Sequence, residues 1–146
     1  MAYYTGETNI LTTAKTSSYF DANNTSQGDW GVLDKGASRY YAIAKPGGDP
    51  GALEFITPLV YQVTWITALE VWARYIDDAT SFSALSGVVN DLIAKFQNNR
   101  TLSGAASIST IVSITAPSYR WSETGPSWIV QEINIRWLEQ IQATYP

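Results

Sequence analysis

The stretch from Val60 to Tyr75 constrains the fold of this chain more than any other. It reads VYQVTWITALEVWARY and alternates like a β-strand, since its odd-numbered positions form a nearly unbroken apolar face. The even-numbered positions are mixed and include the large side chains of Ile66 and Trp72. We therefore predict one long strand whose odd face lies in the core and whose second face is partly apolar.

The length of this strand sets a second constraint. Sixteen residues at about 3.3 Å each span about 53 Å, whereas a compact domain of 146 residues has a diameter of about 40 Å. No glycine, proline or Asn-Gly pair interrupts the stretch, so a hairpin inside it is disfavoured. The strand must either bend through a bulge or project from the domain and pair with something else.

Two segments have the spacing of helices. Near the start, Ile10, Leu11 and Ala14 share one helical face, and Thr8 or Asn9 is the expected cap of this short helix.

A longer amphipathic helix is expected after the long strand, because apolar residues keep helical spacing over residues 82–96. Asp78, Thr80 or Ser81 is its expected cap, and the acidic pair Asp77 and Asp78 suits the positive end of the helix dipole.

The rest of the chain predicts strands and loops. Strands are expected over residues 30–33, 39–45, 108–115 and 128–141, with a loop over 21–29. The order of these elements predicts an α+β fold: a mostly antiparallel β-sheet with one long amphipathic helix packed across it and a short N-terminal helix. At this length we expect a single domain, residues 1–146.

The second face of the long strand raises the question of what covers it. Large apolar side chains interleaved with charges, on a sheet face that the long helix does not cover, are typical of a subunit interface. The alternative is that the N-terminal helix or the segment 46–58 covers this face as a second layer of core. The predicted interface residues are Ile66, Glu70, Trp72, Arg74, Glu132 and Arg136.

Composition argues against most catalytic chemistry. The chain has no Cys and no His, which removes disulfides, thiolate chemistry, ordinary zinc sites and the Ser-His-Asp arrangement. Asp77 and Asp78 are the only adjacent carboxylates, and their position favours a role at the helix start over acid–base catalysis. We expect no catalytic residue, no metal site and no cofactor, and hence a protein that is not an enzyme.

The charge pattern also limits the partners. Net charge is −4 and the nine basic residues are scattered singly, so no basic stripe follows a phosphate backbone. No segment approaches the roughly 18 apolar residues of a membrane span, and the N-terminus lacks a signal-peptide pattern. We expect no membrane partner and synthesis in the cytoplasm.

The aromatic residues suggest a different class of function, that of a ligand-binding module. The chain has six Trp and nine Tyr, and the segment 117–127 places Tyr119, Arg120 and Trp121 among turn residues. An aromatic-rich module that binds carbohydrate or another ligand is therefore an alternative to a structural protein.

The C-terminal two-thirds resembles the tail terminator (tail completion) proteins of long-tailed bacteriophages, the lambda-type group. The resemblance lies in the element order and in residues 55–146: the strand YQVTWITALEVWARYI leads into the helix SFSALSGVVNDLIAKFQ, and the strand WIVQEINIRWLEQI closes the chain. The group has no short diagnostic motif, so no functional residue is carried over. Head-closure proteins of the phage neck are similar in size and character.

The resemblance implies a virion protein of the tail or neck. Such proteins form a hexameric ring that stops polymerisation of the tail tube and docks to the head connector, and DNA passes through the channel without specific binding. On this basis we expect strands 60–75 and 128–141 to build the contacts between copies, which are heterologous in a ring. The loops 46–53 and 117–127 would meet the tube or the connector, and the expected docking residues are Pro46, Asp49, Tyr119, Arg120 and Trp121.

Overall fold

The chain has the predicted α+β fold: two α-helices pack on one mostly antiparallel sheet. The structure is a computed structural model that describes residues 2–28, 38–47, 52–55, 60–104, 106, 108–121 and 125–142. Its elements are α1 (Ala2–Ala14), β1 (Thr25–Gln27), β2 (Tyr40–Pro46), β3 (Ala52–Phe55), β4 (Val60–Arg74), α2 (Asp78–Asn98), the 3-10 turn η2 (Leu102–Gly104), β5 (Ile108–Ile114), β6 (Ser118–Arg120) and β7 (Trp128–Gln142).

The sheet is built around the pair β4 and β7. These two strands run antiparallel and in register over 15 residues each, from Val60 opposite Gln142 to Arg74 opposite Trp128. The strand order is β1-β2-β4-β7-β5, while β3 pairs with the first part of β4 and β6 pairs with the first part of β7. Only the contact of β1 with β2 is parallel among these pairs.

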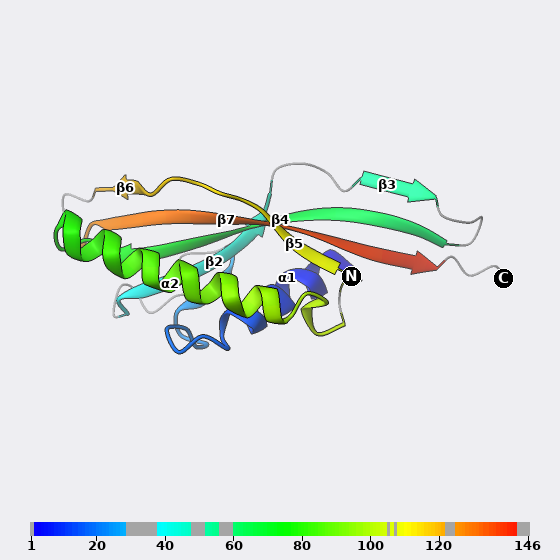
Figure 1. Cartoon of the computed structure of the whole chain (residues 1–146), viewed down its shortest axis with the longest axis horizontal. Helices are drawn as coiled ribbons and strands as arrows, with labels where there is room; N and C mark the ends of the chain where they lie inside the picture. Colours follow the sequence, from blue (N-terminus) through cyan, green and yellow to red (C-terminus); the bar gives the residue numbers. More distant parts are fainter. Residues whose placement is uncertain are drawn as a thin grey trace.

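The long strand β4 is accommodated because its first part projects beyond the helices (Figure 1). Figure 1 shows α1 and α2 on the same face of the sheet, while β3, the start of β4 and the end of β7 extend beyond both helices. The ladder between β4 and β7 has no register shift, and the bulge lies instead in β5, between Ile111 and Ser113. Of the two possibilities, a bulge within the strand or projection from the domain, β4 therefore adopts projection.

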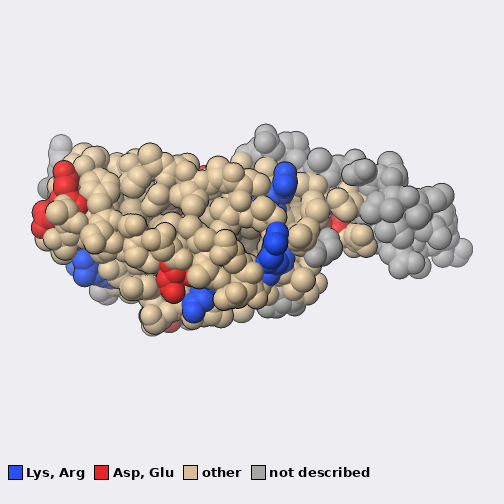
Figure 2. All heavy atoms as spheres, in the orientation of Figure 1, with Lys and Arg blue, Asp and Glu red and all other residues tan. Residues whose placement is uncertain are grey.

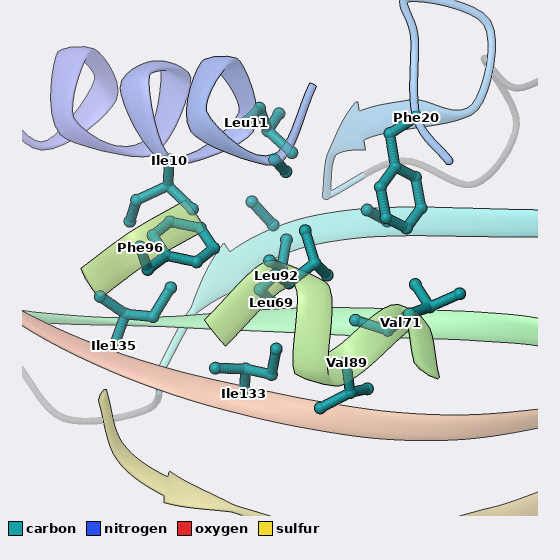
Figure 3. Packing of buried hydrophobic residues seen from close by; sticks show 14 of the residues in the cluster. Ile10, Leu11, Phe20, Leu69, Val71, Val89, Leu92, Phe96, Ile133 and Ile135 are labelled. Atoms are coloured by element: carbon teal, nitrogen blue, oxygen red, sulfur yellow. The ribbon is translucent and has the colours of Figure 1, made fainter. Parts of the chain in front are cut away.

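The core lies between the helices and the odd face of β4, as predicted (Figure 3). Leu69 and Val71 of β4 and Ile133 of β7 are fully buried, and they pack against Leu92 of α2. Helical spacing places the apolar side of α2 on the sheet, and Ile10 and its neighbours close the layer from α1.

A glycine lets α1 approach the sheet closely. A Cβ atom at Gly6 would lie 2.2 Å from the ring of Trp137, so only a residue without a side chain fits between the helix and this indole. Trp137 itself is fully buried, and its Nε1 donates a hydrogen bond of 3.1 Å to Oγ1 of Thr67. Burial of the indole therefore leaves its polar atom satisfied.

The predicted helix caps were wrong. Helix α1 begins at Ala2, so Thr8 and Asn9 lie within it, and the Asn9 side chain instead donates to the carbonyl of Leu102 at 2.9 Å. A helix can start without a strong capping signal where packing on the core stabilises it.

The N-cap of α2 lies one residue before Asp78, the first of the three predicted candidates. Asp77 is the N-cap, and its side chain accepts a hydrogen bond of 2.8 Å from the backbone N–H of Thr80. Asp78 is the first helical residue, and its carboxylate binds tyrosine hydroxyls instead. Ser81 is buried and accepts from the N–H of Ile76 at 2.8 Å.

Three predicted loops contain short strands. The segment 21–29 includes β1, the segment 117–127 includes β6, and the segment 46–53 includes the end of β2 and the start of β3. Each of these strands is short and lies beside a long one that supplies its hydrogen bonds. The strand expected over 30–33 lies outside the described residues.

Candidate interaction surfaces

One part of the second face of the sheet is closed by the chain itself. Tyr41, Ile43 and Trp128 are buried there and pack with the partly buried Trp72; we call these four residues the second-face cluster. The ring of Trp128 meets those of Tyr41 and Trp72 edge to face, at centroid distances of 5.4 and 6.4 Å. The Arg74 guanidinium lies 5.4 Å from the Trp128 centroid, a cation–π contact within the chain.

One charge on this face has a partner within the chain. Glu70 forms an ion pair of 2.7 Å with Lys45 of β2. Across the sheet, Glu70 stands directly opposite Glu132, and like charges in that position repel. The ion pair with Lys45 therefore offsets the repulsion between the Glu70 and Glu132 carboxylates.

The rest of the predicted interface is more open. Ile66 stands opposite Arg136 in the ladder; Ile66 is partly exposed and Arg136 is exposed. The backbone N–H of Gly47 donates to the Ile66 carbonyl at 2.9 Å, and a Cβ at Gly47 would lie 2.4 Å from the Ile66 side chain. Helix α1 lies on the other face, so it does not cover this one. A subunit interface here stays a prediction, centred on Ile66, Glu132 and Arg136.

The edge strand β5 is a surface that the alternation pattern did not reveal. It ends the strand order of the sheet, and its apolar residues Ile108, Val112 and Ile114 are 40%, 43% and 40% exposed. The strand reads ISTIVSI and has no charge and no proline. Its first part is covered by Arg100, whose carbonyl accepts from the N–H of Ser109 at 2.6 Å.

A groove runs between the end of α2 and β5 on the helix side of the sheet. Its volume is about 520 Å³, which lies in the range of sites for small ligands and anchoring side chains. Arg100 is the charged residue among its described lining, and its guanidinium lies 3.4 Å from both the Ser109 carbonyl and Thr110 Oγ1. The lining residues are Ile93, Phe96, Gln97, Arg100, Ser109, Thr110, Ile111, Ile114 and Ile135.

An exposed aromatic patch lies at the other end of α2. We call Tyr75, Asp78, Phe82, Tyr119 and Trp121 the end patch. The Tyr119 and Trp121 rings stack at a centroid distance of 4.9 Å and an interplanar angle of 9°, and Tyr75 meets Trp121 edge to face at 4.9 Å. Phe82 packs edge to face on Tyr119 at 5.8 Å. Trp121 remains 65% exposed, so most of this stack is open to solvent.

A carboxylate organises the end patch. Oδ1 of Asp78 accepts hydrogen bonds from the hydroxyls of Tyr75, at 2.9 Å, and Tyr119, at 3.1 Å. The hydrogen bond to Asp78 is the main cause that raises the pKa of Tyr75 above its ordinary value of 10. The pKa of Tyr119 is raised as well, first by loss of solvent around the hydroxyl and then by the bond to Asp78.

The five predicted docking residues are not brought together. Tyr119 and Arg120 belong to β6 and Trp121 follows it; alternation places Tyr119 on the helix side, while Arg120 lies on the second face and donates to Ser118 Oγ at 2.9 Å. Pro46 is the exposed last residue of β2, and Asp49 lies outside the described residues. The end patch joins Tyr119 and Trp121 to Tyr75, which follows β4, and to residues of α2 that the sequence did not associate with them.

The described residues show no arrangement for metal chemistry or for a helical membrane span. Over the ranges that the structure describes, no three His, Cys, Asp or Glu side chains gather as metal ligands. None of the helices in those ranges is long and apolar enough to cross a membrane.

Comparison with known proteins identifies no family. No family model and no curated protein matches the chain. A solved structure whose name describes no function aligns with 99% of this chain and 94% of its own, with 14% sequence identity and a TM-score of 0.44. A likeness at that TM-score supports no conclusion about either fold or function.

Proposed function

We propose that this protein is a non-enzymatic structural subunit that works as a ring of identical copies. The observation that carries the proposal is the edge strand β5, whose later part exposes Val112 and Ile114 and has no charge. Edge strands are normally protected by charge, proline, a bulge or a covering element, because their free backbone groups pair with other chains. Arg100 covers the first part of β5 and a bulge lies between Ile111 and Ser113, but the exposed apolar side chains beyond Arg100 favour a partner there.

A copy of the same chain suits this edge. The sheet also has apolar surface on its second face at Ile66, so more than one of its surfaces is left incompletely covered. Closed rings require two different surfaces on each subunit, and this chain offers several on separate sides.

The resemblance to the tail terminator group suggests that the ring lies at the end of the tail tube. We infer that the ring, hexameric as in that group, caps the tail tube, stops its polymerisation and joins the tail to the head connector. DNA would pass through the channel without specific binding, which agrees with scattered basic residues and a net charge of −4. Within the same class, a head-closure protein of the neck is the alternative.

The end patch favours one candidate of a different class. Stacked, solvent-exposed rings beside a carboxylate are the usual platform for a sugar or another flat ligand, and Tyr119, Trp121 and Asp78 have that arrangement. A ligand-binding module of this kind would work as a monomer. Its tryptophan fluorescence would change on titration with the ligand.

The decisive experiment adds the purified protein to tail tubes that are still elongating. We expect elongation to halt and negative-stain images to show one ring at the tube end, while light scattering of the free protein reports rings or smaller assemblies. The variant Val112→Lys places a charge on the open edge and should abolish capping, because Val112 is 43% exposed and contributes little to the core.

Asn23→Lys is the matched control, because Asn23 is exposed just before β1, which lies at the opposite end of the strand order from β5. It should leave capping unchanged. Tubes that continue to elongate at saturating wild-type protein, with no ring at their ends, would contradict the proposed function.

A further inference from the structure

We infer that copies of this chain join head to tail, with the end patch of one copy seated in the α2–β5 groove of the next. This inference rests on the proposed self-assembly and names the two surfaces that carry it. The occupant of the groove is thus a second copy of the same chain, and its anchoring residue is Trp121.

The two surfaces occupy opposite ends of one rigid element. The end patch surrounds the first turn of α2, through Asp78 and Phe82, and the groove is lined by its last turns, through Ile93 and Phe96. A helix of 21 residues is about 31 Å long at 1.5 Å per residue, so one copy cannot fill its own groove. Both surfaces face the helix side of the sheet. A neighbour that binds the end patch therefore leaves the groove free for a second neighbour.

The end patch has an exposed anchor, and the groove is large enough to receive a side chain of that size. Trp121 is 65% exposed and has the most exposed side chain among the large described hydrophobic residues. The groove is open, has a volume of about 520 Å³, and combines apolar side chains from α2, β5 and β7 with polar ones at Gln97, Arg100, Ser109 and Thr110. Exposed tryptophan residues that enter apolar pockets are the commonest strong anchors of protein interfaces.

The charges of the two surfaces are complementary. Asp77 and Asp78 are exposed beside the end patch, and Arg100 is the charged residue in the described lining of the groove. Figure 2 shows acidic atoms gathered at the end of the molecule where α2 begins, with a basic side chain below them, and further basic atoms near the part where α2 ends. Within the described residues, the Arg100 guanidinium makes two long contacts of 3.4 Å, and a guanidinium can also meet an indole face or a carboxylate.

The same contact would cover part of the open edge. Ile114, an exposed apolar residue of β5, lines the groove together with Thr110 and Ile111, so a neighbour seated there covers this end of the strand. A head-to-tail contact uses two different surfaces, and it closes into a ring where the rotation between neighbours allows.

Mixing of two variants tests this inference. Trp121→Ala removes the anchor but keeps the groove, whereas Arg100→Glu disables the groove but keeps the end patch. We expect each variant alone to associate at least about tenfold more weakly than the wild type, as expected for loss of an interface anchor. An equimolar mixture should form complexes of two copies, because only one intact contact is possible between the two kinds of chain.

Matched controls separate this contact from general effects. Tyr19→Ala removes another exposed aromatic side chain, and Lys15→Glu reverses another exposed charge; neither residue lies on the two surfaces. Both controls should assemble like the wild type when analysed by ultracentrifugation at the same protein concentrations. Circular dichroism spectra of all four variants should match the wild-type spectrum.

Three outcomes would overturn the inference. Variants that assemble as well as the wild type would show that other surfaces join the copies, even where tubes are still capped. A mixture that stays monomeric would exclude pairing of patch with groove. A wild-type assembly that stops at two copies would indicate a twofold arrangement, in which both contacts form at once. Failure of wild-type protein to cap tubes, with the mixing result intact, would instead reject the proposed function alone.

Discussion

The two aromatic clusters of this protein contain the same kinds of side chain and differ in exposure. In the second-face cluster, Tyr41 is fully buried and Trp128 nearly so. In the end patch, Tyr119 is 39% and Trp121 65% exposed, although their rings stack at a centroid distance of 4.9 Å. Aromatic content alone therefore does not identify a binding surface; the strands around each ring decide whether it is enclosed.

The difference arises from where each cluster sits on the sheet. Tyr41, Trp72 and Trp128 come from three adjacent strands, β2, β4 and β7, so their rings cover one another across the ladder. Tyr119 and Trp121 come from the short strand β6 and the residue beyond it, at a margin of the sheet. A cluster in the middle of a sheet stabilises the fold, whereas a cluster at its margin is free to stabilise a contact with another molecule.

The largest effect should follow from truncation within the second-face cluster. Trp128→Ala removes a buried indole that packs on Tyr41, Trp72 and Arg74, and we expect it to reduce the free energy of unfolding by about 3–5 kcal/mol. Urea denaturation followed by circular dichroism measures this loss. A loss below about 1 kcal/mol would show that the cluster does not support the fold.

Trp72→Ala should cost less, about 2 kcal/mol, because Trp72 is only partly buried. This variant matters for the interface predicted on the second face. Combined with Arg74→Glu, it would also remove contacts to Trp128 within the chain, so a loss of assembly in the double variant would not by itself identify an interface.

Ile66→Ser is the better probe of the predicted second-face interface, since Ile66 is partly exposed outside the second-face cluster. Ring formation by Ile66→Ser at wild-type protein concentration would argue against an interface on this part of the second face.

Sequence patterns predicted the long elements well because each of them has many residues in phase. The odd face of β4, with Leu69 and Val71, and the apolar side of α2, with Leu85 and Leu92, were assigned correctly from period alone. The short strands β1, β3 and β6 escaped prediction, since three or four residues carry too little periodicity and depend on hydrogen bonds from a long neighbour.

The surfaces were harder to predict because they depend on register. The register of β2, β4 and β7 places Glu70 opposite Glu132 and within reach of Lys45. Because α2 and β5 lie between β4 and β7 in the sequence, this register could not be read from the sequence. The end patch likewise joins Tyr75 to Tyr119, 44 positions further along the chain (119 − 75 = 44). The exposed positions of Tyr119 and Trp121 did have a signal in the sequence, their place among turn residues.

Truncation at the end patch should barely affect the fold. We expect Trp121→Ala to lower the free energy of unfolding by about 0.5–1 kcal/mol, because it removes ring contacts with Tyr119 and Tyr75 from a site that is mostly in solvent. Compared with Trp128→Ala under the same denaturation conditions, it gives the sharpest contrast between the clusters. A loss as large as that of Trp128→Ala would mean that the end patch is part of the core.

The smallest expected effect concerns protonation in the end patch. In the folded state the pKa values of Tyr75 and Tyr119 are raised, so the folded protein holds these two protons more tightly than the unfolded chain does. Their contribution to stability is therefore present below pH 10, the ordinary tyrosine value, and is lost as pH rises through the raised pKa values. Asp78→Asn removes the charge that both hydroxyls bind, and should shift the most alkaline part of the tyrosine absorbance titration to lower pH.

Asp91→Asn is the control for this titration, because Asp91 lies on the same helix and accepts a hydrogen bond from Ser17 instead of a tyrosine. It should leave the alkaline part of the curve in place. An unchanged titration in Asp78→Asn would show that Asp78 does not hold the two rings in solution. The carboxylate of Asp78 would then be free of the two hydroxyls, and the stacking of Tyr75, Tyr119 and Trp121 would rest on ring contacts alone.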